Sequence, residues 1–184
     1  VDGTGAVARS YLGLPFKGET LRLYQGDGKG GFQEVSRQQK LTQLSLPMGA
    51  NFGDLDNDGY SDFYLGTGYP NYEALMPNLM YRNQAGQGFA DITTAGGFGH
   101  LQKGHGVVFA DLDNDGDQDV FEQMGGAFPG DSFGDVLFEN PGFENHWLKV
   151  KLIGHKTNKA AIGARIRVTI TENEAKRDIF LYVN

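Results

Sequence analysis

Two nearly identical acidic segments decide the fold of this chain: FGDLDNDGYSDFYLG at residues 52–66 and FADLDNDGDQDVFEQ at residues 109–123. Their surroundings recur with the same spacing, because Tyr24, Tyr81 and Phe138 are separated by the interval that separates Phe52 from Phe109, a period of 57. A fixed period of this length indicates repeated supersecondary units. The fold is therefore predicted from the repeat rather than from either segment alone.

Each unit contains short strand-like runs around its acidic loop. Strands are expected on either side of the loops, at 48–54, 62–67, 105–111 and 119–124. Further strands are expected at 32–35, 78–83, 89–92 and 135–140. No segment has a sustained helical period. Because four strands per unit are typical of a propeller blade, the predicted fold class is all-β: a partial β-propeller of four-stranded blades plus a C-terminal β-rich segment.

The number of units is too small for a closed propeller. The period covers about two and a half blades, whereas closed propellers have roughly 4–8. Both ends of the chain are interpreted as cut: the start because it begins at Val1 with neither a methionine nor a signal peptide, and the end because its last β domain is expected to continue beyond Asn184. We expect the remaining blades to come from further sequence of the same protein or from other chains, because open sheet edges tend to associate.

Composition agrees with an all-β protein and excludes several classes. The 184 residues include 28 glycines, which favour turns, and 13 Phe and 8 Tyr, which favour strands. There is no cysteine, so disulfides, thiolate metal sites and a cysteine nucleophile are excluded. No apolar run approaches the ~20 residues of a membrane span.

Charge is distributed unevenly. Residues 1–144 carry 8 basic and 20 acidic residues, whereas 145–184 carry 8 basic and 3 acidic ones. Such a shift indicates a domain boundary, so repeats are expected over 1–144 and a different β domain over 145–184. Nucleic-acid binding is not expected, because the repeat region is strongly acidic.

The acidic loops have the pattern of a calcium site. Positions 1, 3, 5 and 9 are aspartates in both copies, position 6 is a turn-forming glycine, and position 7 can offer a backbone carbonyl. A hard cation that takes 6–8 oxygen ligands suits this set, and calcium fits better than magnesium. The candidate ligands of the two sites are Asp54, Asp56, Asp58, Tyr60 and Asp62, and Asp111, Asp113, Asp115, Asp117 and Asp119.

Two alternatives compete with a propeller calcium loop. The first is a solvated acidic turn, which two copies in register disfavour. The second is an EF-hand, which needs flanking helices and a bidentate Glu at position 12. Position 12 is Leu65 in one loop and Glu122 in the other, and both lie in strand-like runs, so Glu122 is predicted to be a strand residue. Asp117 is expected to supply only its carbonyl, because its counterpart is Tyr60.

The two segments resemble FG-GAP/VCBS repeats over about residues 10–140. That family includes the calcium-bearing blades of integrin α-subunit propellers. The resemblance implies that aspartates at positions 1, 3, 5 and 9 and the carbonyl at position 7 hold calcium in a hairpin loop. The Phe-Gly element survives as Phe52-Gly53 and becomes Phe109-Ala110 in the second copy.

The C-terminal segment has a different pattern. LKVKL (148–152) and ARIRVTI (164–170) alternate strictly, which predicts half-buried strands with basic outer faces. NHWL at 145–148, followed by Gly154, Asn158 and Ile162-Gly163-Ala164, resembles the start of an ASPIC/UnbV domain. This order of parts is similar to the layout of cartilage acidic protein and implies no catalytic chemistry. The basic face is interpreted as solvated, with polyanion binding or docking on the acidic repeats as alternatives.

Two catalytic motifs and one metal-ligand pair are set aside. Gly26–Gly31 fits GxGxxG, but a strand-like run follows it, so a hairpin turn is predicted. Gly130–Gly134 fits the GxSxG nucleophile elbow, but it too leads into a strand. His100 and His105 lack a third ligand for zinc. No catalytic residue and no organic cofactor is predicted.

The predicted function is that of a calcium-binding extracellular interaction or adhesion module, in which calcium is structural and the protein is not an enzyme. Its partner, a protein or a polysaccharide, cannot be named from the sequence. The alternatives are a non-catalytic propeller part of a larger secreted enzyme and a self-assembling cell-surface subunit. The expected location is extracellular, cell-surface or periplasmic.

Overall fold

The computed structural model describes the whole chain except residues 1–2, 70–74, 127, 157, 173 and 184. The chain divides into two compact units, Val1–His146 and Trp147–Asn184. Each unit is described separately below. The first unit holds both acidic loops.

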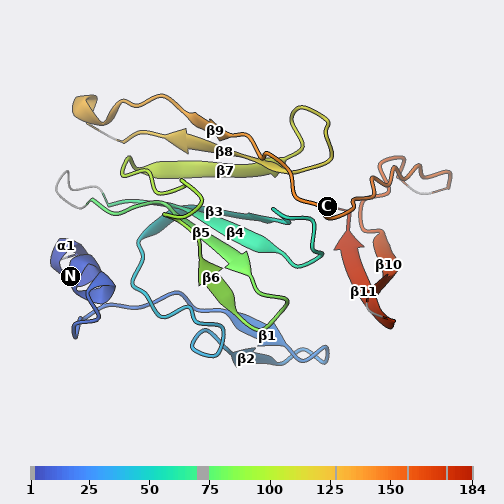
Figure 1. Cartoon of the computed structure of the whole chain (residues 1–184), viewed down its shortest axis with the longest axis horizontal. Helices are drawn as coiled ribbons and strands as arrows, with labels where there is room; N and C mark the ends of the chain where they lie inside the picture. Colours follow the sequence, from blue (N-terminus) through green and yellow to red (C-terminus); the bar gives the residue numbers. More distant parts are fainter. Residues whose placement is uncertain (1–2, 70–74, 127, 157, 173, 184) are drawn as a thin grey trace. The chain divides into compact units, whose positions relative to one another are not determined.

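The first unit consists mainly of antiparallel sheets in chain order (Figure 1). A two-stranded sheet contains β1 (Tyr24–Gly26) and β2 (Phe32–Glu34). A four-stranded sheet contains β3 (Pro47–Gly53), β4 (Asp62–Thr67), β5 (Leu79–Asn83) and β6 (Phe89–Asp91). A three-stranded sheet contains β7 (Gly104–Ala110), β8 (Asp119–Met124) and β9 (Val136–Phe138). These open sheets confirm the predicted all-β partial propeller.

The register of the sheets repeats with the period of the sequence. Phe52 of β3 pairs with Phe63 of β4, and one repeat later Phe109 pairs with Val120. The irregularity that follows Pro47 in β3 recurs after Gly104 in β7. The second and third sheets are therefore two copies of one blade, and the third sheet has one strand fewer.

The first two strands of the second sheet, β3 and β4, closely approach the first strand of the third sheet, β7. A Cβ atom on Gly49 would overlap the carbonyl oxygen of His105, and one on Gly66 would lie 2.7 Å from the backbone of Gly104. No side chain can occupy such positions without moving the backbone. Glycine at these sites lets the two blades pack backbone against backbone.

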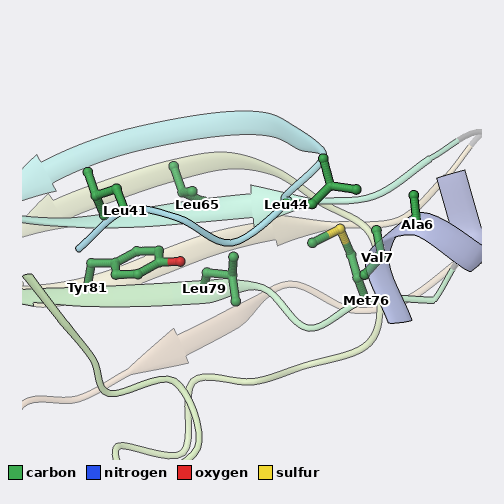
Figure 2. Packing of buried hydrophobic residues seen from close by; sticks show 8 residues of the cluster. All are labelled: Ala6, Val7, Leu41, Leu44, Leu65, Met76, Leu79 and Tyr81. Carbon is green, nitrogen blue, oxygen red and sulfur yellow. The ribbon is translucent and has the colours of Figure 1, made fainter. Parts of the chain in front are cut away.

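The second sheet packs against a hydrophobic cluster on each of its two faces. Leu65 of β4 and Leu79 and Tyr81 of β5 face a cluster that also contains α1 (Gly3–Tyr11) and the segment before β3 (Figure 2). The alternate residues Tyr64 and Met80 face a second cluster against the third sheet. Side chains of neighbouring strand residues point to opposite faces, so the run of apolar residues in β4 and β5 serves both clusters.

The sequence pattern predicted no helix, and this prediction was wrong for α1. Its residues show no long apolar period, yet Ala6 and Val7 are buried in the cluster beside Leu44. The Ser10 hydroxyl oxygen also accepts a hydrogen bond from the Leu44 backbone at 2.8 Å. Packing rather than propensity stabilises this short helix. No helix in the described part of the chain is long and apolar enough to cross a membrane.

The set-aside motifs have the predicted local structures. Asp27, in the Gly26–Gly31 stretch, accepts hydrogen bonds from the backbone of Lys29 and Gly31 within the hairpin between β1 and β2. A short 3₁₀ turn, Pro129–Asp131, precedes β9, so the Gly130–Gly134 stretch leads to a strand and not to a helix.

The second unit contains one hairpin, formed by β10 (Arg165–Glu172) and β11 (Ala175–Tyr182). Ile166, Val168 and Ile170 alternate as half-buried residues, as predicted for this strand. The strand predicted at 148–152 is wrong, because these residues have no regular structure. Its alternating pattern suits a strand, but the described part of this unit offers it no partner strand.

Candidate metal centres

The two acidic loops share a backbone shape that brings their oxygens together. Position 4 is left-handed in both, with φ of 54° at Asn57 and 67° at Asn114. Position 6 is left-handed as well, with φ of 82° at Gly59 and 101° at Gly116. Asparagine and glycine tolerate this conformation best, so Asn-x-Gly fixes the tight turn after the first aspartates.

The aspartate at position 9 ties each loop to its own blade. Asp62 accepts hydrogen bonds from the Leu55 backbone at 2.8 Å and from the Asn83 backbone at 2.7 Å. Asp119 makes both corresponding contacts in the next repeat, at 3.0 and 2.9 Å. This residue therefore holds the loop closed against the third strand of its blade, whether or not it also binds a cation.

In the first loop, three carboxylates converge. Asp54, Asp56 and Asp62 each offer an oxygen that lies within 4.8 Å of the others. Asp58 is not part of this group, and its carboxylate accepts a hydrogen bond from the backbone of Tyr60 at 2.8 Å. The structure thus brings together three of the four carboxylates expected for this site.

Asp56 has the most informative environment of the three. It is 3% exposed, and its Oδ2 lies 2.8 Å from Nε of Arg82. Its Oδ1 is buried and has no hydrogen-bond partner among the described residues. A buried carboxylate oxygen without a partner is costly, and a cation among the three aspartates would satisfy it.

In the second loop, a different trio converges. Asp111, Asp113 and Asp115 meet the same 4.8 Å criterion, and the last two are exposed. Asp119 is not in the group. At position 7 the N–H of Asp117 donates to the Asp115 carboxylate at 2.9 Å, as Tyr60 does in the first loop. The carbonyl ligands proposed at Tyr60 and Asp117 remain predictions.

Burial and mutual repulsion both oppose ionisation in the loops. Burial raises the pKa of Asp62 to about 7, helped by the nearby charges of Asp56 and Asp54, although two backbone N–H groups act against the shift. Burial also raises the pKa of Asp54. The pKa of Asp117 is raised by its partial burial and by Asp115. A cation would reverse these shifts, because opposite charge favours the ionised form.

The loops are also joined to each other, a feature that no sequence pattern predicted. The Asn57 amide donates to the Asp117 carboxylate and, at 3.4 Å, to the Gly116 carbonyl. In return, the Gln118 side chain accepts a hydrogen bond from the Asp54 backbone at 2.7 Å. A single unit could not reveal these contacts, because they depend on how neighbouring blades pack.

Other supporting residues could have been found from the repeat. Asn83 and Asn140 occupy equivalent positions of successive units, and both donate their backbone N–H to the position-9 aspartate. Asn140 also donates its side-chain amide to the Leu55 carbonyl of the preceding blade at 2.7 Å. The recurrence of Asn at this position was the available signal.

The donor set of both centres is made of oxygen atoms. Carboxylates and backbone carbonyls suit calcium or magnesium and do not favour the softer transition metals. The residues present fit a hard divalent cation, and the unpartnered Oδ1 of Asp56 gives this fit a structural basis.

Comparison with known proteins bears on the repeat units. The family model of FG-GAP-like repeats matches residues 11–65 and 68–122, which is more than half of the chain. Each matched segment runs from the later strands of one blade through the acidic-loop hairpin of the next. No curated protein matches the chain.

Proposed function

Because this chain belongs to the FG-GAP-like repeat family, we propose that it is a calcium-binding, non-catalytic module of an extracellular adhesion or interaction protein. Repeats of this kind are typical of extracellular or periplasmic proteins and typically carry no catalysis. Calcium is assigned a structural role in both acidic loops. The ligands proposed are Asp54, Asp56, Asp58 and Asp62, and Asp111, Asp113, Asp115 and Asp119, with the carbonyls of Tyr60 and Asp117.

The buried Oδ1 of Asp56 is the observation that supports this role most strongly. Arg82 pairs with only one oxygen of the carboxylate, and two further aspartates each place an oxygen within 4.8 Å of this group. A cation at this point would join the loop to the body of the blade. Without a cation, the buried Oδ1 of Asp56 would have no partner. The expected role of the metal is therefore to stabilise the fold rather than to take part in catalysis.

Calcium binding can be measured directly by isothermal titration calorimetry on the calcium-free chain. We expect two calcium ions per chain and weaker binding of magnesium, which prefers fewer protein ligands and a stricter octahedron. Asp113→Asn should reduce the count to one, because its carboxylate belongs only to the second trio. Asp27→Asn removes the same charge from an unrelated hairpin turn and should leave two sites. A chain that takes up no calcium at millimolar concentration would contradict the proposal.

The second unit extends the proposal. The segment from Asn145 onward is assigned to the start of an ASPIC/UnbV-like domain, which would make 1–144 the repeat domain and 145–184 a separate β domain. Its motif residues and the hairpin of β10 and β11 support this assignment. The exposed face of the hairpin includes Arg165, whose guanidinium lies 4.1 Å from the ring centroid of Phe180. This stacking favours an ordinary solvated face over a polyanion site.

A second candidate function, self-assembly, is favoured by one open sheet face. Leu55 of the first acidic loop and Met80 of the second sheet are buried, at 6% and 0% exposure, in the cluster that packs against the third sheet. Their counterparts in the next repeat, Leu112 and Leu137, are 52% and 53% exposed. Each blade of this type is thus built to be covered by the next one. A further blade from a second copy would cover Leu112 and Leu137 in the same way.

Self-association can be tested by sedimentation velocity over a range of protein concentrations. We expect dimers or short oligomers at tens of micromolar, since the exposed patch is small. Leu137→Lys should return the chain to a monomer, and Leu148→Lys, a change at an exposed leucine of the second unit, should not. Monomers at every concentration, or association unaffected by Leu137→Lys, would rule out this face as a contact between copies.

A further inference from the structure

A second candidate site lies at the end of the third sheet opposite its acidic loop. There, the start of β7, the end of β8 and the turn before β9 enclose an open cavity of about 540 Å³. This volume is in the range of small-molecule sites. The lining residues used below are His105, Gln123, Phe128, Asp131, Ser132 and Phe133.

One lining residue of the cavity, Asp131, belongs to a buried ion pair. Lys103 Nζ lies 2.5 Å from the Asp131 carboxylate, and both side chains are about nine-tenths buried. Two backbone contacts fix the turn around this pair, from Gly126 to the Asp131 carbonyl and from Gly125 to the Lys103 carbonyl, both at 2.9 Å. The cavity is therefore a built feature of this blade rather than an accident of a loose loop.

The internal repeat shows that the fold does not require these residues. In the blade formed by the second sheet, which is called the second blade below, the positions of Lys103, His105 and Gln123 are occupied by Leu46, Met48 and Gly66. The register of the two blades is nevertheless the same. Residues that the two blades share are needed for the fold. The polar residues Lys103, His105 and Gln123 are not shared, so their presence in the third sheet's blade needs an explanation other than folding. Ligand binding supplies one, since His105 and Gln123 both line the cavity.

The hydrogen-bonding groups of the cavity are neutral and amphoteric. His105 Nε2 lies 2.7 Å from the Gly125 carbonyl, which can only accept, so Nε2 carries a proton, and in the neutral ring Nδ1 is then an acceptor. The Gln123 amide and the Ser132 hydroxyl can both donate and accept. This inventory matches hydroxyl groups, which also donate and accept at once.

Aromatic rings complete the cavity. Phe128 and Phe133 are 50% and 46% exposed, and Lys103 Nζ lies 5.9 Å from the Phe128 ring centroid. Asp131 is the one carboxylate of the described lining, and it is already paired with Lys103. Exposed rings beside neutral hydroxyl-binding groups suit a ligand with an apolar C–H face and a polar rim. We propose that this cavity binds a neutral sugar unit of a polysaccharide. The inference rests on the proposed interaction role and names its ligand class, but it does not depend on calcium.

The test is NMR titration of the full chain, in calcium, with neutral hexasaccharides of glucose, xylose, mannose and N-acetylglucosamine. A sulfated heparin hexasaccharide serves as the charged comparator. We expect at least one neutral sugar to bind at about millimolar Kd and to shift the amides of Gly125, Gly126 and Ser132. His105→Met, which installs the residue of the second blade, should weaken binding about tenfold, as should Gln123→Ala, since one hydrogen bond is lost in each. The matched control Met48→His should leave the affinity unchanged.

Three results would overturn the sugar site: no binding of any neutral hexasaccharide, preference for the sulfated one, or shifts confined to residues outside the cavity. Calcium uptake is measured in the same samples by calorimetry. A chain that binds calcium but no sugar refutes this inference and leaves the calcium proposal intact. A chain that binds sugar but takes up no calcium refutes the calcium proposal and leaves this inference intact.

Discussion

Removal of calcium should lower the melting temperature of this chain by roughly 10–20 °C. A ligand that binds only the folded state at a hundred times its Kd adds about 2.7 kcal/mol per site. Two such sites add about 5 kcal/mol, and each kcal/mol is worth about 2–4 °C in a domain of this size. The measurement is thermal unfolding followed by circular dichroism, in millimolar calcium and in excess chelator.

A substitution in one loop separates this effect from a general loss of charge. Asp113 is exposed, and outside its trio the hydrogen bond that it makes among the described residues is accepted from the Asp115 backbone at 3.2 Å. Asp113→Ala should therefore reproduce about half of the chelator effect and leave little else changed. Asp27→Ala, in a hairpin turn that belongs to neither of the acidic clusters found among the described residues, should retain the full calcium response. Identical melting curves with and without calcium would defeat the structural role of the metal.

The two loops should also respond together. Asn57 of the first loop holds Asp117 of the second, and Gln118 of the second holds the Asp54 backbone of the first. A cation that orders one loop therefore also orders contacts made by the other. For this reason the loss from Asp113→Ala is expected to be at least half of the total, not less.

The strands were predictable because the repeat carries redundant information. Aspartate loops, glycines and aromatic residues recur at one spacing, so two weak strand patterns support each other at every position. The hairpin turn between β1 and β2 was predicted from the strand-like run that follows Gly26–Gly31. By contrast, α1 and residues 148–152 lie outside the repeat, where local pattern alone had to decide. Tertiary contacts stabilise α1 although its local pattern is weak. Residues 148–152 have the pattern of a strand but no partner strand among the described residues, and they have no regular structure.

The candidate site was predictable only in part, for a related reason. Position counting within one loop identified the aspartates, because a small loop brings its own side chains together. It could not show that Arg82 neutralises one oxygen of Asp56, or that Asn57 reaches into the next loop. Those contacts join segments that are far apart in the chain. That all four carboxylates of each loop bind the metal remains a prediction.

Glu122 is expected to give the chain a pH-dependent stability. It lies in β8, as predicted, where the second blade has Leu65, and it is fully buried between the two blades. Its Oε2 is 2.8 Å from the hydroxyl of Tyr64, which is also 2.8 Å from the Phe98 carbonyl. Of the described residues, Tyr64 is the titratable group in contact with this carboxyl.

A count of protons shows which form of Glu122 the fold requires. The Tyr64 hydroxyl has one hydrogen, and the Phe98 carbonyl has none to give. An ionised Glu122 would leave one of the two short oxygen contacts without a proton. A protonated Glu122 donates to Tyr64, which then donates to Phe98, and both contacts are satisfied. Burial acts in the same direction, because it raises the pKa of Glu122 to about 7, although a hydrogen bond donated by Tyr64 to the ionised carboxylate would lower that pKa.

The sign of the pH effect follows from this shift. The folded chain holds its proton up to about pH 7, whereas the unfolded chain releases it near 4.5. The contribution to stability is therefore complete below pH 4.5, falls as the pH rises, and is lost above about 7. A shift of this size corresponds to at most about 3 kcal/mol. Urea unfolding between pH 4.5 and 8.5 should show this decline.

Glu122→Gln should remove this decline, since its amide can donate to Tyr64 at every pH. Relative to the natural chain, the variant should be about equally stable at pH 5 and more stable by up to about 3 kcal/mol at pH 8.5. Glu139→Gln, an exposed change just beyond β9, is the matched control and should leave the pH profile as it was. Because Asp62 also has a raised pKa, the difference between variant and natural chain is the informative quantity. A constant difference across the whole pH range would mean that Glu122 does not change its protonation in this window, and that the proton count above is wrong.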